Sequence, residues 1–308
     1  MNNQLILFLS QIFNGLKIGS VYSLVALGYT MVYGIIRLIN FAHGDFIMVG
    51  SYVLMLITPM LIASGVPAWV AVIPAIIVCV IVGVVVEKAA YKPVRKKGNS
   101  MTALITAIAM SLLLENGAQA VFGADYKTIP NILNLPAIKF GALRITGDTL
   151  LSIVLGIIIM IGLQLFIKYT RNGKAMRAVA EDKEAATLMG INVDSTITLT
   201  FAIGAALAGV ASLMYCAAYP QVSPMMGAML GLKAFVAAVL GGIGSIPGAM
   251  IGGIAIGIIE SLTTAYIGTI TGGIITSAFS DAIVFGILII VLLVKPTGLM
   301  GKNLGEKV

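Results

Sequence analysis

Ionisable and amide side chains interrupt the apolar stretches of this chain at a few positions. Asn40, His43 and Asp45 lie close together in one polar break, and Glu115 lies deep inside an apolar stretch of its own. A charge at membrane depth costs about 2.5 kcal/mol or more, so such residues usually face the protein interior or a water-filled path. These residues either line a transport route or its gate, or are structural. In the second case Asp45 caps the following helix and Glu115 makes an interhelical hydrogen bond.

Two more acidic residues, Glu260 and Asp281, lie near the ends of later apolar stretches. One interpretation again makes them lining residues of a transport route. We favour the other, in which each carboxylate bonds to a neighbouring helix or reaches the membrane interface.

Other kinds of chemistry find little support in the residues present. A single histidine excludes a multi-histidine metal site, and Cys79 and Cys216 lie in apolar stretches where packing is their expected role. The Gly-Lys pair at 173–174 lacks the upstream glycine and the Ser or Thr of a Walker A motif. We expect no catalytic, cofactor or metal site on this chain, which cannot by itself be an ATPase of the Walker A kind.

The elements that position these residues are predicted to be membrane-spanning helices. Of the 308 residues, 59% are hydrophobic and only 10% are charged, whereas a soluble domain carries roughly a quarter charged residues. We predict an all-α, polytopic transmembrane bundle of about eight to ten spans, forming a single transmembrane domain over 1–308. The predicted spans are 18–36, 46–63, 69–86, 101–122, 149–167, 197–217, 228–245, 248–268 and 278–294.

Two polar, glycine-containing breaks stand out, near 38–50 and 241–248. Irregular backbone at membrane depth is tolerated only where it is buried in protein or faces water, so we predict broken or re-entrant helices at both places. Matching breaks in two halves are also a sign of an internal repeat in transporters, although the similarity is faint. The candidate residues of the translocation pathway are Asn40, His43, Asp45, Glu115, Gly242, Gly244 and Pro247.

Many glycines are spaced four residues apart, which places them on one face of a helix. Gly15 and Gly19, Gly227 and Gly231, and the pairs within 244–257 have this spacing. Small residues at i and i+4 let two helix backbones approach closely. We therefore predict tight helix–helix crossings at these pairs.

The distribution of Lys and Arg predicts the orientation. Most of the 19 basic residues lie in the 88–100 and 168–196 loops and in the C-terminal tail, whereas the 123–148 loop holds few. By the positive-inside rule the basic loops are cytoplasmic and 123–148 is the main periplasmic loop. Nine crossings, with the N-terminus outside and the C-terminus inside, satisfy this pattern. With no Lys or Arg before Lys17, we expect the first apolar segment to be retained.

The loop at 168–196 contains a charged, alanine-rich segment. From about Lys174 to Gly190 its composition favours a helix, with Gly190 as the C-terminal stop. Such a helix is either simply solvated or is used to contact a cytoplasmic partner.

Motifs in this segment and elsewhere resemble those of a known family. Glu184-Ala185-Ala186-x-x-x-Gly190 resembles the EAA-type loop of bacterial ABC importer permeases, although the usual Leu-Pro ending is absent. Further stretches look like those of branched-chain amino acid permeases, in particular their H-type subunits, and the resemblance runs from about residue 14 to the end. These stretches are 28–44, 87–95, 180–182, 188–192, 233–248 and 295–299.

The resemblance implies a permease subunit of an ATP-driven importer in the bacterial inner membrane. Its implied partners are a second homologous permease in a heterodimer, two ABC ATPases that bind ATP-Mg, and a periplasmic binding protein that delivers leucine, isoleucine or valine. No nucleic-acid partner is expected. The implied ATPase-coupling residues are Arg177, Glu181, Asp182, Glu184, Ala185, Ala186 and Gly190.

Two other classes of transporter remain open from the residues alone. An ion-coupled secondary transporter of small amino acids would use Glu115, Asp45 and His43 as coupling groups. A passive channel would use the glycine-rich breaks as a filter. The matched motifs favour the ABC permease.

Overall fold

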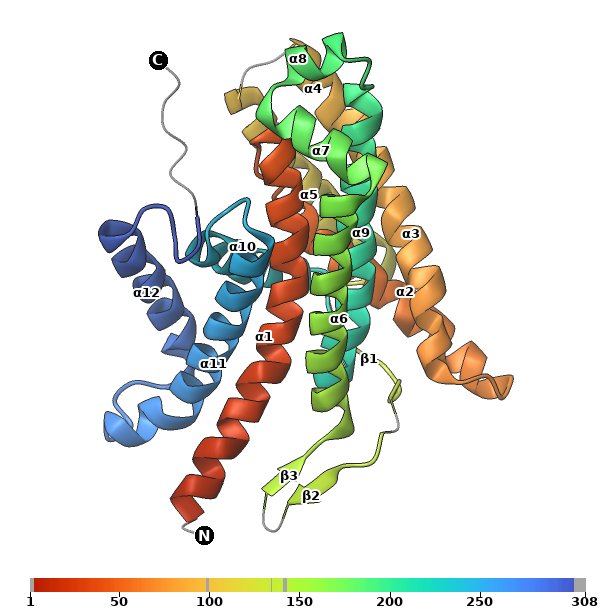
Figure 1. Ribbon diagram of the computed structural model, residues 1–308. Helices are drawn as coiled ribbons and strands as arrows, with labels where there is room; N and C mark the ends of the chain where they lie inside the picture. Colours follow the sequence, from red (N-terminus) through yellow and green to blue (C-terminus); the bar gives the residue numbers. More distant parts are fainter. Residues whose placement is uncertain (1–2, 98–99, 134, 141–142, 302–308) are drawn as a thin grey trace.

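Helices make up most of the computed structural model, which describes residues 3–97, 100–133, 135–140 and 143–301 (Figure 1). Within these described residues, eight helical segments are long and apolar enough to cross a membrane, and α10 is a shorter apolar helix. The all-α polytopic bundle is therefore confirmed, and these nine segments match the nine predicted spans. The nine main helices are α1 Asn3–Ile36, α2 His43–Ala63, α3 Val72–Val86, α5 Ser100–Phe122, α6 Gly147–Tyr169, α9 Val193–Ala218, α10 Met226–Gly241, α11 Ile246–Ile270 and α12 Ser280–Val294.

Shorter elements lie at the two ends of the bundle. Antiparallel pairing joins β2 to β3, and β1 to β4. In Figure 1 the strands β1 to β3 lie at one end, hereafter the hairpin end (127–145), and α4, α7 and α8 lie at the other, the α7–α8 end (171–188). The predicted 123–148 and 168–196 loops thus lie at opposite ends. The short elements are η1 Ala68–Ala71, η2 Glu87–Tyr91, α4 Lys92–Lys97, β1 Lys127–Thr128, β2 Ile138–Phe140, β3 Leu143–Ile145, α7 Arg171–Glu181, α8 Lys183–Leu188, β4 Gln221–Val222 and η3 Ser277–Phe279.

Among the boundaries that differ from the predicted ones, two have a clear physical cause. The first helix begins at Asn3 instead of 18 because the residues before 18 are largely apolar and contain no proline, and Gly15 continues the helix where it packs against α11. The seventh ends at Gly241 instead of 245, because Gly242 adopts a φ of 101° that no helix can continue. The hydroxyl of Ser245 then accepts a hydrogen bond from the Gly248 amide (3.2 Å) and caps α11.

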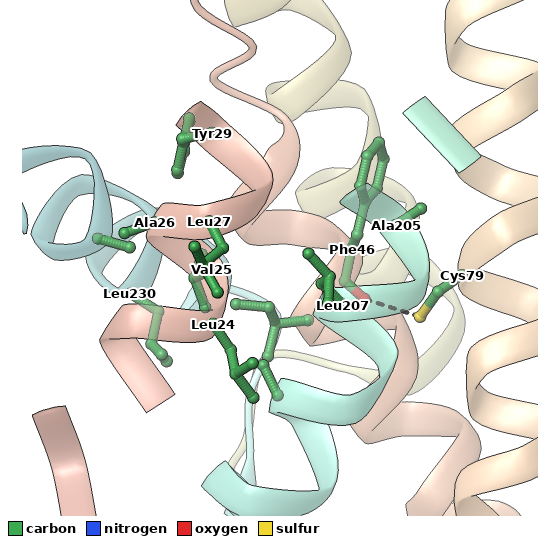
Figure 2. Packing of buried hydrophobic residues seen from close by; sticks show 14 of the residues in the cluster. Leu24, Val25, Ala26, Leu27, Tyr29, Phe46, Cys79, Ala205, Leu207 and Leu230 are labelled. Atoms are coloured by element: carbon green, nitrogen blue, oxygen red, sulfur yellow. Dashed lines mark hydrogen bonds between the residues drawn. The ribbon is translucent and has the colours of Figure 1, made fainter. Parts of the chain in front are cut away.

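The core forms where α1, α2 and α9 meet (Figure 2). Leu24, Val25 and Leu27 of α1 are fully buried, as is Phe46 of α2. The thiol of Cys79 donates a hydrogen bond to the Phe46 carbonyl (3.1 Å), and both cysteines are buried and unpaired. This confirms packing as the role of the cysteines.

Glycine pairs allow a close crossing of the helices α1 and α11. A Cβ added at Gly257 would collide with the backbone of Gly19 and the Gly15 carbonyl, and one added at Gly19 would meet Ile254. The i, i+4 pairs of the two helices therefore face each other, as predicted. The contact maximises van der Waals packing where lipid supplies no hydrophobic drive.

Replacing Gly257 with leucine is expected to separate α1 from α11 and to lower the free energy of unfolding by about 1–3 kcal/mol through overpacking. The measurement is the melting temperature of the purified, detergent-solubilised chain, detected by its aggregation on heating. Gly162→Leu is the matched control, because a Cβ at Gly162 meets no atom within 4 Å. Equal melting temperatures for the two variants would contradict the crossing.

Candidate functional site

The helix α2 begins inside the bundle and not at its end. The chain leaves α1 at Ile36, turns at Arg37 with a φ of 59°, and returns so that the His43 ring lies directly against Gly28 of α1. The imidazole is 1% exposed. The predicted break is thus confirmed but shorter than 38–50, because the helix is regular from His43 onward.

Buried polar groups without partners gather around this helix start. Tyr91 donates a hydrogen bond to Oδ1 of Asn40 (2.7 Å), and Ser111 donates one to Oδ2 of Asp45 (2.5 Å). The other side-chain polar atoms of Asn40 and Asp45, Nε2 of His43 and Oε1 of Glu115 have no partner among the described residues. Buried polar atoms are normally paired, so this set leaves donor and acceptor atoms open to further partners. The candidates Asn40, His43 and Asp45 therefore share one region. Glu115 adjoins it, because it lies one turn beyond Ser111 on α5.

The second break is a tight turn between α10 and α11. Gly242 and Gly244 have φ values of 101° and 92°, a conformation that favours glycine, and Pro247 lies in the first turn of α11. The turn is held by the C-terminal segment, because Leu299 and Met300 donate backbone hydrogen bonds to the carbonyls of Leu240 and Gly241 (2.8 and 2.9 Å).

The two breaks lie on either side of a small apolar recess. Ile39 comes from the first break and Ile243 from the second, with Tyr33 and Phe235 between them. Gly244 also packs beside Gly34 of α1. The structure thus brings the two sets of pathway candidates near each other at the C-terminal ends of α1 and α10.

The charged segment at the α7–α8 end consists of two helices and not the single helix predicted. Asp182 leaves the helical conformation, and its Oδ1 accepts hydrogen bonds from the amides of Glu184 and Ala185 (2.8 and 3.0 Å). An aspartate that can cap a new helix competes with continuation of the old one. Gly190, with a φ of 81°, ends α8 as predicted.

The predicted coupling residues divide into structural and exposed groups. Arg177 donates hydrogen bonds to the carbonyls of Ile167 and Lys168 (3.0 and 3.1 Å), which caps α6 and holds α7 against it. Ala186 is buried. The exposed residues are Glu181, Asp182, Glu184, Ala185 and Gly190.

Sequence reasoning missed the two most accessible apolar residues of this segment. Leu188 is 88% exposed and Met189 is 82% exposed at the tip of α8. Apolar side chains presented outside the spans typically mark an interaction surface. Their position directly before the helix-ending Gly190 is the signal that could have identified them.

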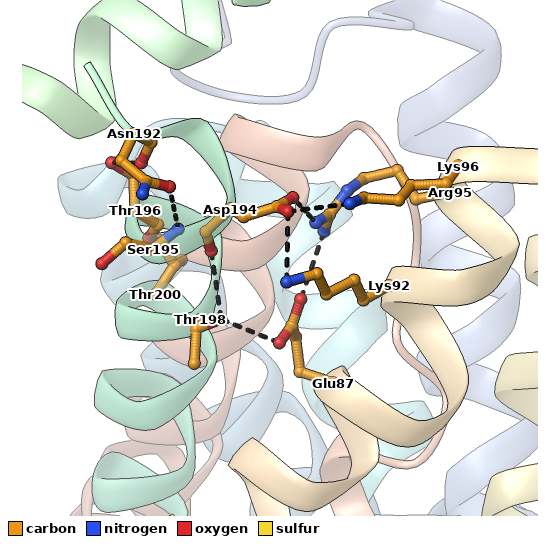
Figure 3. A network of polar contacts seen from close by, with 10 residues as sticks. All are labelled: Glu87, Lys92, Arg95, Lys96, Asn192, Asp194, Ser195, Thr196, Thr198 and Thr200. Atoms are coloured by element: carbon orange, nitrogen blue, oxygen red, sulfur yellow. Dashed lines mark hydrogen bonds and ion pairs between the residues drawn. The ribbon is translucent and has the colours of Figure 1, made fainter. Parts of the chain in front are cut away.

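A network of ion pairs ties the start of α9 to η2 and α4 (Figure 3). Arg95 binds both Oε1 of Glu87 (3.3 Å) and Oδ1 of Asp194 (2.6 Å). The Glu87 side chain is fully buried, and its other oxygen accepts a hydrogen bond from Thr198 (2.8 Å). Lys92 and Lys96 also pair with Asp194 (3.1 and 3.3 Å). The basic residues of this loop thus have a structural role in addition to the topological role inferred from sequence.

The network continues to the break before α2. Tyr91 lies one turn beyond Glu87 in the π-helix η2, and its hydroxyl holds Asn40. π-helical turns are rare and often mark functional sites. Partial burial, followed by the charges of Arg95 and Arg37, lowers the pKa of Lys183 at the start of α8. The network and the α2 break are therefore physically continuous, and Lys183 of α8 lies within electrostatic range of Arg95 in the network.

Comparisons with known proteins cover essentially the whole chain. The family model described as "Branched-chain amino acid transport system / permease component" matches residues 11–292. The high-affinity branched-chain amino acid transport system permease protein LivH of Salmonella typhimurium is 45% identical, with 100% of both chains covered. BraD, the permease protein of the same kind from Pseudomonas aeruginosa, is 43% identical over 98% of both chains. A probable branched-chain amino acid transport permease of Methanocaldococcus jannaschii is 32% identical over 91% of this chain and 88% of its own.

Proposed function

The chain belongs to the permease family of branched-chain amino acid transport systems, and on this premise we propose that it forms the translocation path of an ATP-driven importer of leucine, isoleucine and valine. Full-length identity of 45% to a permease of that description carries this proposal. The chain is a transport subunit, and ATP-Mg binds to its partners.

The proposed partners are a second homologous permease, two ABC ATPases and a periplasmic amino-acid-binding protein. The exposed tip of α8, with Leu188 and Met189, has the shape and chemistry to enter an apolar groove on an ATPase. Glu184 and the capped turn at Asp182 set the angle of this tip.

The proposed orientation places the α7–α8 end in the cytoplasm of a bacterium and the hairpin end outside its inner membrane. The basic residues of α4 and α7 gather at the first end, as the positive-inside rule requires. The N-terminus is then outside and the C-terminus inside.

The proposed mechanism is alternating access driven from the α7–α8 end. Closure of the two ATPases displaces α8 and the start of α9. The ion pairs of Asp194, Arg95 and Glu87 pass this displacement to η2, and Tyr91 passes it to Asn40. The start of α2, whose buried polar atoms have no fixed partners, then exchanges contacts and opens or closes the path.

Glu184→Lys combined with Gly190→Val is expected to reduce uptake at unchanged abundance of the chain. Charge reversal alters the face of α8, and a β-branched residue at a φ of 81° is strained by roughly 1–2 kcal/mol. The measurement is ATPase activity stimulated by the binding protein, with Gly162→Val as the control. Unchanged stimulated activity would show that α8 is not the coupling element.

The test of the function as a whole is affinity purification of the tagged chain from its native membrane, followed by mass spectrometry and an ATPase assay. We expect a second permease and two P-loop ATPases with vanadate-sensitive hydrolysis. A lone chain or homo-oligomer without ATPase, under conditions that preserve known ABC complexes, would contradict the importer.

An ion-coupled secondary transporter is the second candidate. The buried, unpartnered carboxylate oxygens of Asp45 and Glu115 favour it. Uptake that collapses with an uncoupler while ATP is maintained would support this candidate, whereas uptake that follows ATP would exclude it.

A further inference from the structure

A polar recess of about 400 Å³ lies between α1, α11 and the C-terminal end of α9. Its position is near the hairpin end, since Lys17 on its wall pairs with Asp148 at the start of α6, directly after β3. Small-molecule sites typically have volumes of about 300–1,000 Å³ with a few converging polar groups. The pathway candidates at the α2 break do not line this recess.

Opposite charges face the recess from its two main walls. Lys17 stands on α1, and Glu260 stands on α11. Both side chains are only 15% exposed, so their charges are weakly screened by solvent. Lys17 uses one of its three ammonium donors for Asp148, so two remain for a ligand.

An ion-pair cluster anchors the acidic wall. Glu260 accepts hydrogen bonds from Tyr22 and Lys233 (2.7 Å each), and Lys233 also pairs with Asp281 (2.7 Å). Interhelical bonding of Glu260 and Asp281, favoured from sequence, is thereby confirmed. The cluster fixes the carboxylate in place, and each of its oxygens retains a lone pair for a further donor.

Neutral polar and apolar groups complete the lining. Asn14 on α1 and Thr264 on α11 are exposed and have no hydrogen-bond partner within the described part of the chain. Ile18, Ala218 and the ring of Tyr219 supply apolar surface beside them. The recess therefore presents a cation, an anion, two free polar groups and an apolar patch.

We propose that this recess is an outer-facing binding site for the zwitterion of a neutral, apolar α-amino acid. Lys17 and Asn14 bind the α-carboxylate, Glu260 and Thr264 bind the ammonium, and the branched side chain packs on Ile18 and Tyr219. The inference rests on the proposed function and adds to it a site on this chain. The ligand enters and leaves unchanged, so no bond forms or breaks.

The test uses the whole importer, with its ATPases, partner permease and binding protein, reconstituted in vesicles. The probe is photo-leucine, a diazirine analogue of leucine, with the labelled peptides identified by mass spectrometry. The variant is Asn14→Leu with Thr264→Val. The matched control is Asn116→Leu with Thr106→Val on α5, where both side chains are exposed and bond only to their own helix.

We expect labelling of α1 or α11 that excess leucine displaces. In the variant, labelling and uptake fall about tenfold, as expected when hydrogen bonds to a bound ligand are lost. ATPase activity stimulated by the binding protein persists, and the control behaves as wild type.

Different results would overturn the site or the proposed function on which it rests. Label found elsewhere, or equal in variant and wild type while wild-type uptake is intact, would refute the recess alone. An ethanolamine phospholipid retained by the wild type and lost from the variant, without photo-leucine label, would assign it to a lipid headgroup. Absence of wild-type uptake of leucine, isoleucine and valine, despite ATP and binding protein, would instead refute the proposed function beneath it.

Discussion

Replacing Arg95 with methionine is expected to abolish ATP-driven uptake and to lower the free energy of unfolding by about 3–5 kcal/mol, the cost of leaving one buried charge unpaired. Among the residues that the structure describes, Arg95 is the only cation that pairs with Glu87, whose side chain is fully buried. Its loss also removes the 2.6 Å contact to Asp194. The measurements are uptake into vesicles and thermal unfolding of the purified complex.

Two further variants separate stability from coupling. Lys96→Met is the matched control, because Lys96 is 58% exposed and lies 3.3 Å from the same Asp194. Such exposed pairs contribute about 0–1 kcal/mol. The double variant Arg95→Met with Glu87→Met is expected to recover stability, because an apolar replacement of a buried pair is often neutral. We expect the complex that contains this double variant to hydrolyse ATP without uptake. Full recovery of uptake would show that the pair is merely structural.

Changing both Leu188 and Met189 to glutamate is expected to remove the ATPases from the purified complex while leaving the chain folded. The two side chains are 88% and 82% exposed, so they contribute little to the packing of the chain itself. An apolar surface that enters a partner groove loses its binding free energy when it carries charge, with hot-spot losses of about 2 kcal/mol or more. Co-purification of the ATPases from membranes measures the effect.

The control for this variant is Tyr126→Glu, which places a charge on a 75% exposed aromatic residue at the hairpin end. It should retain both ATPases. Retention of the ATPases by the Leu188 and Met189 variant, at normal uptake, would rule out the tip of α8 as the docking element.

Local composition was enough to predict the helices and their breaks. The spans appear in the sequence because each must present about 20 apolar residues to lipid, and Gly242 and Gly190 end helices by their own backbone preferences. The glycine pairs at i and i+4 likewise predicted close crossings, since the spacing alone places them on one face. The departures were equally local in cause, such as the cap formed by Asp182 that divides α7 from α8.

The tertiary structure alone decided which of these features meet. Arg95 and Asp194 are 99 residues apart in sequence, and Tyr91 and Asn40 are 51 apart. No periodicity records such a pairing, because it depends on how the spans pack around one another. The recess near the hairpin end has the same origin, with walls from α1 and α11, which are far apart in the chain.

The sequence by itself therefore determined the class of protein, its spans and its family, because lipid solvation and helix geometry act on each segment separately. Only the fold decided that Lys17 and Glu260 line one recess, and that η2, through Glu87 and Tyr91, links α9 to the break before α2. The physical reason is that charge pairing and cavity shape depend on distances between segments that are remote in the chain.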